Sequence, residues 1–234
     1  MSILASKTVR PFSLGFSVLS DVFPGFRFGD FAVLYGNAAS FISFLLLVRS
    51  QFPFEHGGLD SPAIFIDGGN SFDPYTIADI ARGYGLDARE ILEKIQVSRA
   101  FTLYQLSSLI LEKTYSALRK NRAKLLVVSD VSSLFFDRDI PKTEAGELFM
   151  KVCNKLSQTA SEAETVVVAT YFPETQSKQG LFFEAVLFGR CNVSVRMRRQ
   201  RNGLNIALED HPRIKPFSVD LTVEYSSFQR NWER

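Results

Sequence analysis

Short, continuous apolar runs recur along the chain and alternate with segments of helical spacing. The runs are Phe31–Tyr35, Ala63–Ile66, Leu125–Val128 and Thr165–Ala169. Apolar runs of this length without alternation are typical of strands that are covered on both faces. Their alternation with helices predicts an α/β fold, in which a mostly parallel central sheet is flanked by helices.

The segments between the runs carry recognisable helix signals. Asp73 followed by Pro74 predicts an N-cap and a proline at the first helical position. Asp87, with a glutamate three residues later, predicts a second capped start. Apolar residues at helical spacing predict two longer helices, over Thr102–Asn121 and Glu144–Ser161.

The C-terminal part changes to a β pattern. Apolar and polar residues alternate over Asn192–Arg199, and Asn202 and Gly203 then predict a type I′ turn before Leu204–Leu208. We therefore expect a C-terminal β-hairpin region within one domain over residues 1–224. Residues 225–234 form a polar tail of the kind that is often disordered.

Composition limits the classes of function. The 234 residues are 46% hydrophobic and 22% charged, which is typical of a globular domain. The net charge of +2 predicts that any nucleic-acid surface is a local patch. His56 and His211 are too scattered for a histidine metal site, so no metal is expected. Cys153 and Cys191 form no C-x-x-C pair and fit a reducing compartment.

The sequence predicts a cytoplasmic protein with no membrane segment. The first twenty residues contain Lys7 and Arg10 and no long apolar run, which is unlike a signal peptide. The apolar run Ala38–Val48 has 11 residues, fewer than the ~20 that a membrane-spanning helix needs.

The segment GNAASFIS at residues 36–43 stands where a phosphate-binding loop would follow the first strand. Such a loop reads G-x-x-x-x-G-K-[ST]. Gly36 and Ser43 fit, but Phe41 replaces the second glycine and Ile42 replaces the lysine. A phenyl ring prevents the backbone from closing around phosphate, and an isoleucine supplies no positive charge. Phe41 has the size to fill the vacated phosphate space.

Several neighbouring motifs resemble the ATPase core of RecA-type recombinases, most closely the archaeal RadA group and its paralogues. FAVLYG resembles the strand that delivers the P-loop, and AIFIDGGNSF resembles that group's YIDTEGTF strand. IADIARGYGLD resembles its AxRYGLD helix. The motifs SRAF, LLVV and RMRR follow in the family's order. The similarity extends from about Pro11 to about Val223, and it implies a RecA-like P-loop fold.

The resemblance also implies which residues would form the nucleotide site. The general-base glutamate of the family corresponds to Gly69, two residues after Asp67. The acidic residue that helps to hold Mg²⁺ corresponds to Ser129, with Asp130 one residue later. Because a slip of one residue turns a side chain to the opposite face of a sheet, Asp130 would need a bulge to replace Ser129.

The chain is therefore expected not to be an enzyme: it would be a degenerate ATPase without a cofactor, and ATP binding is not expected. Phosphoryl transfer depends on positioning and charge neutralisation. The replaced lysine, glutamate and metal carboxylate would have supplied both. One alternative stays open, an unorthodox ATPase that uses Ser43, Asp67 and Asp130.

Two loops correspond to the DNA-facing loops of the family, over roughly residues 134–144 and 172–180. They contain Arg138, Lys142 and Lys178, together with several acidic residues. The loops are candidates for phosphate contact and aromatic stacking, or they are ordinary polar loops.

The densest basic feature is the predicted hairpin, which carries Arg196, Arg198, Arg199 and Arg201. These arginines could neutralise phosphates, pair with acids on a partner, or form a solvated edge that prevents strand aggregation.

The segment DHPRIKP at residues 210–216 corresponds to a turn that, in recombinases, caps the ATP of a neighbouring protomer. Arg213 and Lys215 are the candidate contacts across that interface. The alternative is a basic β-turn without this role.

These features together lead to one functional expectation. We expect a non-catalytic recombinase paralogue that acts as an accessory factor in homologous recombination or DNA repair. Its partners would be a recombinase or another RecA-like paralogue in a hetero-oligomer, and DNA bound weakly. The alternative from another class is a purely structural subunit without DNA contact.

Overall fold

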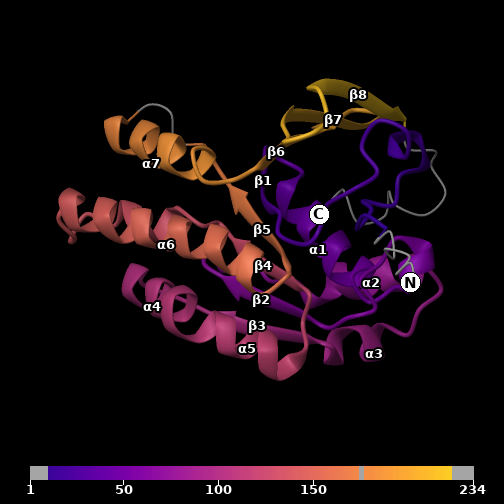
Figure 1. Ribbon diagram of the computed structural model, residues 1–234, viewed down its shortest axis with the longest axis horizontal. Helices are drawn as coiled ribbons and strands as arrows, with labels where there is room; N and C mark the ends of the chain where they lie inside the picture. Colours follow the sequence, from indigo (N-terminus) through magenta and orange to yellow (C-terminus); the bar gives the residue numbers. More distant parts are fainter. Residues whose placement is uncertain (1–9, 174–176, 223–234) are drawn as a thin grey trace, which may run out of the picture.

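The computed structural model describes residues 10–173 and 177–222. The expected polar tail at 225–234 lies outside these residues. One eight-stranded sheet runs through the domain in the order β3-β2-β4-β5-β1-β6-β7-β8 (Figure 1). The strands are β1 (Phe31–Tyr35), β2 (Ala63–Asp67), β3 (Ile95–Arg99), β4 (Leu125–Ser129), β5 (Val166–Tyr171), β6 (Val193–Gln200), β7 (Gly203–Asp210) and β8 (Phe217–Thr222).

Strands β1 to β6 pair in parallel. Strand β6 also pairs with β7, and β7 with β8, so that these three strands form an antiparallel meander. All four apolar runs are strands, which confirms the expected α/β fold. Every residue of β2, β4 and β5 is buried, as expected for strands covered on both faces. β3 was not predicted, because it is an edge strand in which Ile95 alone is buried.

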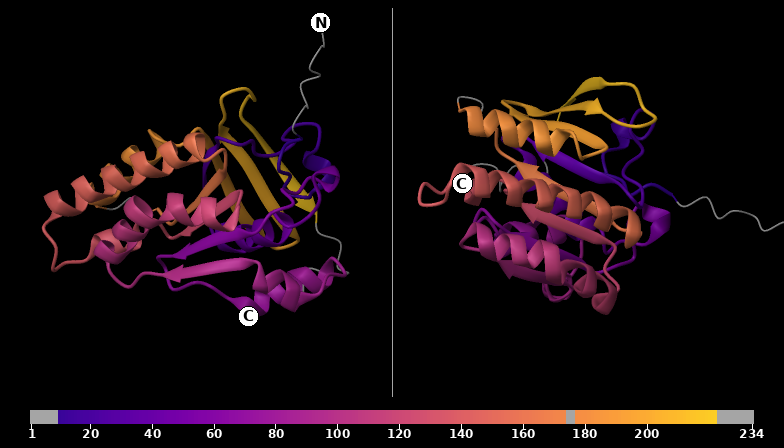
Figure 2. Two further views of the ribbon diagram at one scale, coloured as in Figure 1. Left: turned by 60° about the horizontal axis from the view of Figure 1, so that its bottom comes forward. Right: turned by 60° about the vertical axis from the view of Figure 1, so that its left-hand side comes forward.

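Helices cover both faces of this sheet. The helices are α1 (Ala39–Arg49), α2 (Pro74–Gly83), α3 (Ala88–Glu93), α4 (Leu103–Ser108), α5 (Thr114–Asn121), α6 (Lys142–Glu162) and α7 (Lys178–Phe188). Helices α1 to α3 pack with Ala32 and Leu34 of β1 into one core, and α4 to α7 pack with Phe31 and Val33 into the other. Figure 2 shows α6 and α7 side by side on the second face.

The expected caps are present. The Asp73 carboxylate accepts hydrogen bonds from the backbone N–H groups of Tyr75 and Thr76 at the start of α2. The Asp87 carboxylate accepts from those of Arg89 and Glu90 at the start of α3.

The helix expected over 102–121 contains a π-helical turn, Leu109–Lys113, between α4 and α5. Within the described residues, no helix is both long and apolar enough to cross a membrane.

The hairpin at Asn202 is confirmed, but its turn type is not. Gln200 pairs with Gly203, so Arg201 and Asn202 form the two-residue connection. A type I′ turn needs positive φ at both central residues. Among residues 200–203, Gly203 alone has a positive φ, of 158°. The glycine is needed because a Cβ there would lie 1.9 Å from the Leu221 oxygen of β8, a strand that the sequence pattern did not reveal.

Candidate functional site

The loop that resembles a P-loop joins β1 to α1 and lies against β6. Gly36 has a φ of 99°, and a Cβ on it would lie 2.3 Å from the Met197 carbonyl oxygen. The Ala38 N–H donates to that same oxygen at 3.2 Å. The Asn37 side-chain oxygen accepts from the Arg199 N–H at 2.7 Å. This loop is therefore tied to β6 by hydrogen bonds of its own backbone and of the Asn37 side chain.

The side chains at the last two positions of the motif, Ile42 and Ser43, are also held inside the domain. Ile42 is fully buried in the core on the α1 face. The Ser43 hydroxyl, 1% exposed, donates to the Ser40 carbonyl at 2.6 Å, one turn back along the helix. Phe41 is half-buried and packs against the same core. That this ring fills a former phosphate space stays a prediction.

Asp67, at the end of β2, is fully buried, and its carboxylate has several partners. It accepts from the N–H groups of Ser71 at 2.8 Å and Phe72 at 3.1 Å. It also forms an ion pair with Arg99, whose Nε lies 3.1 Å away on the neighbouring strand β3. The carboxylate therefore holds together the loop after β2 and the edge strand.

Ser129 is the last residue of β4 and is fully buried in the sheet. Asp67 and Ser129 are directly paired across β2 and β4. The hydroxyl groups of Ser129 and Ser71 lie 2.5 Å apart, so Ser129 also braces the loop after β2. A serine hydroxyl is neutral, and Ser129 therefore brings no charge for a divalent cation to this position.

Asp130 follows β4 without a bulge. Neither the β2–β4 nor the β4–β5 pairing contains a register shift. Asp130 has a left-handed φ of 48°; its N–H donates to Thr170 and its carboxylate accepts from the Ser133 N–H at 3.3 Å. Burial raises the pKa of Asp130, hydrogen bonds from Ser133 oppose this, and the nearby Asp67 charge adds to it.

The two candidate DNA loops lie next to each other at the ends of β4 and β5. The Gln179 side chain donates to the Phe135 carbonyl at 3.0 Å. The rings of Phe136 and Phe183 pack edge to face, with their centroids 5.1 Å apart. The basic candidates Arg138, Lys142 and Lys178 are exposed. Residues 174–176 of the second loop lie outside the described residues.

The four arginines of the hairpin are not equivalent. Arg196 is partly buried, and its Nε lies 3.1 Å from a Glu209 carboxylate oxygen, an ion pair without hydrogen-bond geometry. Tyr35 donates its hydroxyl proton to the same glutamate. Arg198, Arg199 and Arg201 are exposed at or near the turn of the hairpin. Any phosphate contact by Arg196 therefore competes with Glu209.

Comparison with known families agrees with this architecture. The family model for Rad51 matches residues 17–183, which is more than half of the chain. The chain belongs to the Rad51 family. The matched part includes the loop after β1, Asp67, Gly69, Ser129 and Asp130 and ends within α7. In this Rad51-family chain, the arginine hairpin and the turn at 210–216 lie beyond the matched part.

That turn connects β7 to β8 and presents its two basic side chains to solvent. Arg213 and Lys215 are exposed. The turn is organised by His211, whose Nδ1 accepts from the N–H groups of Arg213 and Ile214, each at 3.0 Å. Burial lowers the pKa of His211; the Asp30 charge opposes this, and the Arg213 charge adds to it.

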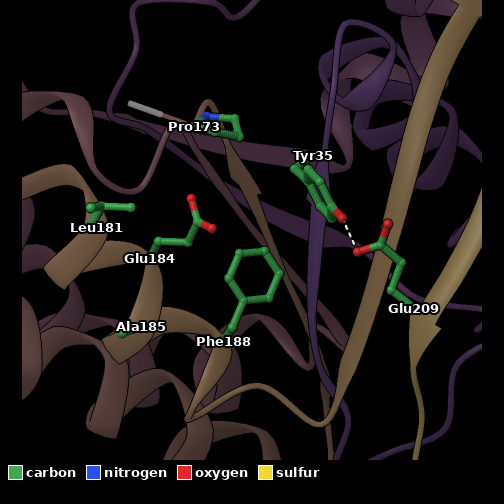
Figure 3. Close-up of a pocket in the computed structure, with 7 residues that line it drawn as sticks. All are labelled: Tyr35, Pro173, Leu181, Glu184, Ala185, Phe188 and Glu209. Carbon is green, nitrogen blue, oxygen red and sulfur yellow. Dashed lines mark hydrogen bonds between the residues drawn. The ribbon is translucent and has the colours of Figure 1, made fainter. Parts of the chain in front are cut away.

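Sequence reasoning missed one feature of this Rad51-family domain. A cavity lies between α7 and the ends of β1 and β7, and Tyr35, Glu184 and Glu209 are among the residues that line it (Figure 3). These residues are far apart in the sequence and belong to no common motif. Their proximity depends on the β6–β7 register, which shifts by a bulge between Ser194 and Val195. No sequence signal could have found it.

Proposed function

We propose that this chain is a non-catalytic Rad51-family protein, a RadA-like paralogue that acts as an accessory factor in homologous recombination or DNA repair. It would bind a recombinase or another RecA-like paralogue in a hetero-oligomer and contact DNA weakly. The observation that carries the proposal is the engagement of the loop after β1, where the Ala38 N–H donates to Met197 and Ile42 lies in the core.

The other two altered positions support the same conclusion. Transfer of a phosphoryl group needs a positioned water or hydroxyl and neutralisation of the developing charge. Gly69 has no side chain with which to position a water, and Ser129 has no charge with which to hold Mg²⁺. The carboxylate of Asp67 already forms an ion pair with Arg99 and accepts a hydrogen bond from the N–H of Ser71 in the loop after β2. ATP is therefore not part of the proposed activity of this chain.

The experiment that tests the proposal measures ATP binding and hydrolysis by the purified protein, with and without DNA. We expect neither above background. A catalytically intact Rad51-family recombinase from the same cell is the positive control, and the protein is then added to it. A change in the recombinase's ATPase rate or filament length supports an accessory role. ATP turnover by the protein itself that Asp130→Ala abolishes would contradict the proposal and favour the unorthodox ATPase.

A structural subunit without DNA contact is the second candidate, and the hairpin provides an observation in its favour. Arg196, the arginine nearest to the sheet centre, is already paired with Glu209. The dependence of DNA affinity on salt discriminates the two candidates, because contacts to phosphate release counterions. No salt-dependent binding at all would favour the structural subunit.

The exposed turn offers a separate test of the hetero-oligomer. If Arg213 and Lys215 reach the nucleotide of a neighbouring recombinase, the double substitution Arg213→Ala and Lys215→Ala should weaken an ATP-dependent complex. Both side chains are exposed, so the fold should keep its stability. A matched control is Arg82→Ala with Lys120→Ala, which removes two exposed cations from α2 and α5.

A further inference from the structure

A groove lined by apolar side chains and by two carboxylates lies between α7 and the sheet. Its volume is about 490 Å³, within the range of ligand sites in proteins. The apolar part of its lining consists of Tyr35, Pro173, Leu181, Ala185 and Phe188. Two carboxylates, Glu184 and Glu209, complete it. Figure 3 shows the α7 side chains facing Tyr35 and Glu209 across the groove.

The two carboxylates differ in their partners. Glu209 accepts from the Tyr35 hydroxyl and forms an ion pair with Arg196. Within residues 10–173 and 177–222, the hydrogen bond that Glu184 accepts is a long one, 3.4 Å, from the Tyr171 hydroxyl. None of the ion pairs among the described residues involves Glu184. The groove therefore carries one negative charge that no cation of the described chain compensates.

Apolar side chains are exposed beside this charge. Leu181 in the groove wall is 52% exposed. Phe182, the next residue of α7, is 42% exposed, but its ring lies near Gly146 of α6 and does not line the groove. Phe172, which precedes Pro173, is 43% exposed. An exposed apolar side chain in a groove wall, with another next to it in the chain, is compatible with a surface that binds another protein.

We propose that this groove binds a segment of a partner protein in which a lysine or arginine is flanked by apolar residues. The cation would meet Glu184, and its alkyl stem and neighbours would cover Leu181, Ala185 and Phe188. Long basic side chains combine a polar head with an apolar stem in this way. The inference deepens the proposed hetero-oligomer, because it names the surface and the chemistry of the partner.

The acidic lining argues against nucleic acid as the occupant. Phosphates bind where cations neutralise them. Here the groove presents two carboxylates, and the nearest arginine, Arg196, is already paired with Glu209. None of the basic candidates lines this groove, and Arg196, which contacts it through Glu209, is neutralised there.

The test uses short peptides as probes and the full chain labelled with ¹⁵N. Acetyl-Leu-Arg-Leu-amide is titrated to millimolar concentration, and backbone amide signals are followed by NMR. We expect shifts confined to Tyr35, Leu181, Ala185 and Phe188, with a weak, saturable affinity. Glu184→Gln keeps an acceptor for Tyr171 and should weaken binding about 5- to 10-fold, as expected for loss of a charge-assisted contact. Glu147→Gln, at an exposed position of α6, should leave the affinity unchanged.

Each alternative occupant has its own outcome. Equal shifts with acetyl-Leu-Glu-Leu-amide, or no local shifts with the arginine peptide, would overturn the proposal. Shifts at the same residues with a hexathymidine oligonucleotide would also overturn it. ATP turnover by the protein would contradict the proposed function but leave a positive peptide result standing. Loss of the peptide result, in turn, would leave the argument about the nucleotide loop intact.

Discussion

Gly69 and Asp130 are in contact at the carboxyl ends of β2 and β4, and each restricts what the other position can hold. A Cβ on Gly69 would lie 2.7 Å from the Cβ of Asp130 and 3.2 Å from one of its carboxylate oxygens. Asp130 occupies this space because its φ is 48°. The position that resembles a catalytic glutamate therefore cannot regain a side chain while Asp130 keeps this conformation.

We predict that Gly69→Ala destabilises the protein by about 1–3 kcal/mol, the cost of overpacking a close contact. The loss should become smaller in an Asp130→Gly background, because that change removes the opposing Cβ and suits a positive φ. A double-mutant cycle from urea unfolding should give a coupling of about 1 kcal/mol or more.

The matched control is Gly83→Ala at the end of α2, where a Cβ would meet nothing within 4 Å. It should be neutral or stabilise by up to about 1 kcal/mol, since alanine favours helix. Additive effects of the Gly69 and Asp130 substitutions would show that the contact carries no energy.

A second prediction concerns the position that resembles the P-loop lysine. Ile42→Lys should destabilise the protein by more than about 3 kcal/mol, because it places an ammonium group in an apolar core. Ile42→Val should cost only about 0.5–1.5 kcal/mol at the same site. Both values can be measured by urea unfolding monitored by circular dichroism. A well-tolerated lysine would mean that an open phosphate space still exists there.

The sequence predicted the strands whose two faces are both buried, and it missed those at the sheet edges. β2 and β4 appear as apolar runs because helices cover them on both sides. β3 and β8 are edge strands, each with a single buried residue, so neither gives an apolar run. The caps at Asp73 and Asp87 were predictable because capping depends on local residues alone.

The candidate site was predictable in part, because Asp67 and Ser129 directly follow apolar runs that can be seen locally in the sequence. Their pairing across β2 and β4 was seen in the structure alone. The hydrogen bond from Ala38 to Met197, and the contact between Gly69 and Asp130, join segments far apart in the chain. Such contacts depend on how the loops pack against the sheet, and no local pattern encodes them.

A third prediction concerns the different surroundings of the hairpin arginines: Arg196 is paired with Glu209, whereas Arg198 is exposed. If the hairpin binds duplex DNA, Arg198→Ala should reduce the slope of log K against log[salt] by about 0.9, the value for one phosphate. Arg196→Ala should reduce it by less, since Glu209 already compensates that charge. The measurement is fluorescence anisotropy of a labelled duplex over a range of salt concentrations. Equal effects would indicate that the Arg196–Glu209 pair opens on binding.

The last prediction concerns the pH dependence of the turn at residues 210–216. Burial lowers the pKa of His211, so the folded protein binds its proton less tightly than the unfolded chain, whose imidazole has a pKa of about 6.5. The unfolded state therefore binds more protons in this window, and stability should fall as the pH drops from about 6.5 through the folded pKa. Protonation of Nδ1 would also remove the acceptor for Arg213 and Ile214.

The substitution His211→Asn isolates this effect, because an asparagine side chain can also accept hydrogen bonds from backbone N–H groups two and three residues further on but does not titrate. Urea midpoints of both proteins are compared at pH 7.5 and pH 5.5. All other groups titrate in both proteins, so the difference between the two shifts reports His211. We expect the native protein to lose more stability than the variant on acidification, with faster amide exchange at Arg213 and Ile214. A native protein that gains stability relative to the variant would mean that His211 is charged in the fold and that its Nδ1 is not the acceptor that orders this turn.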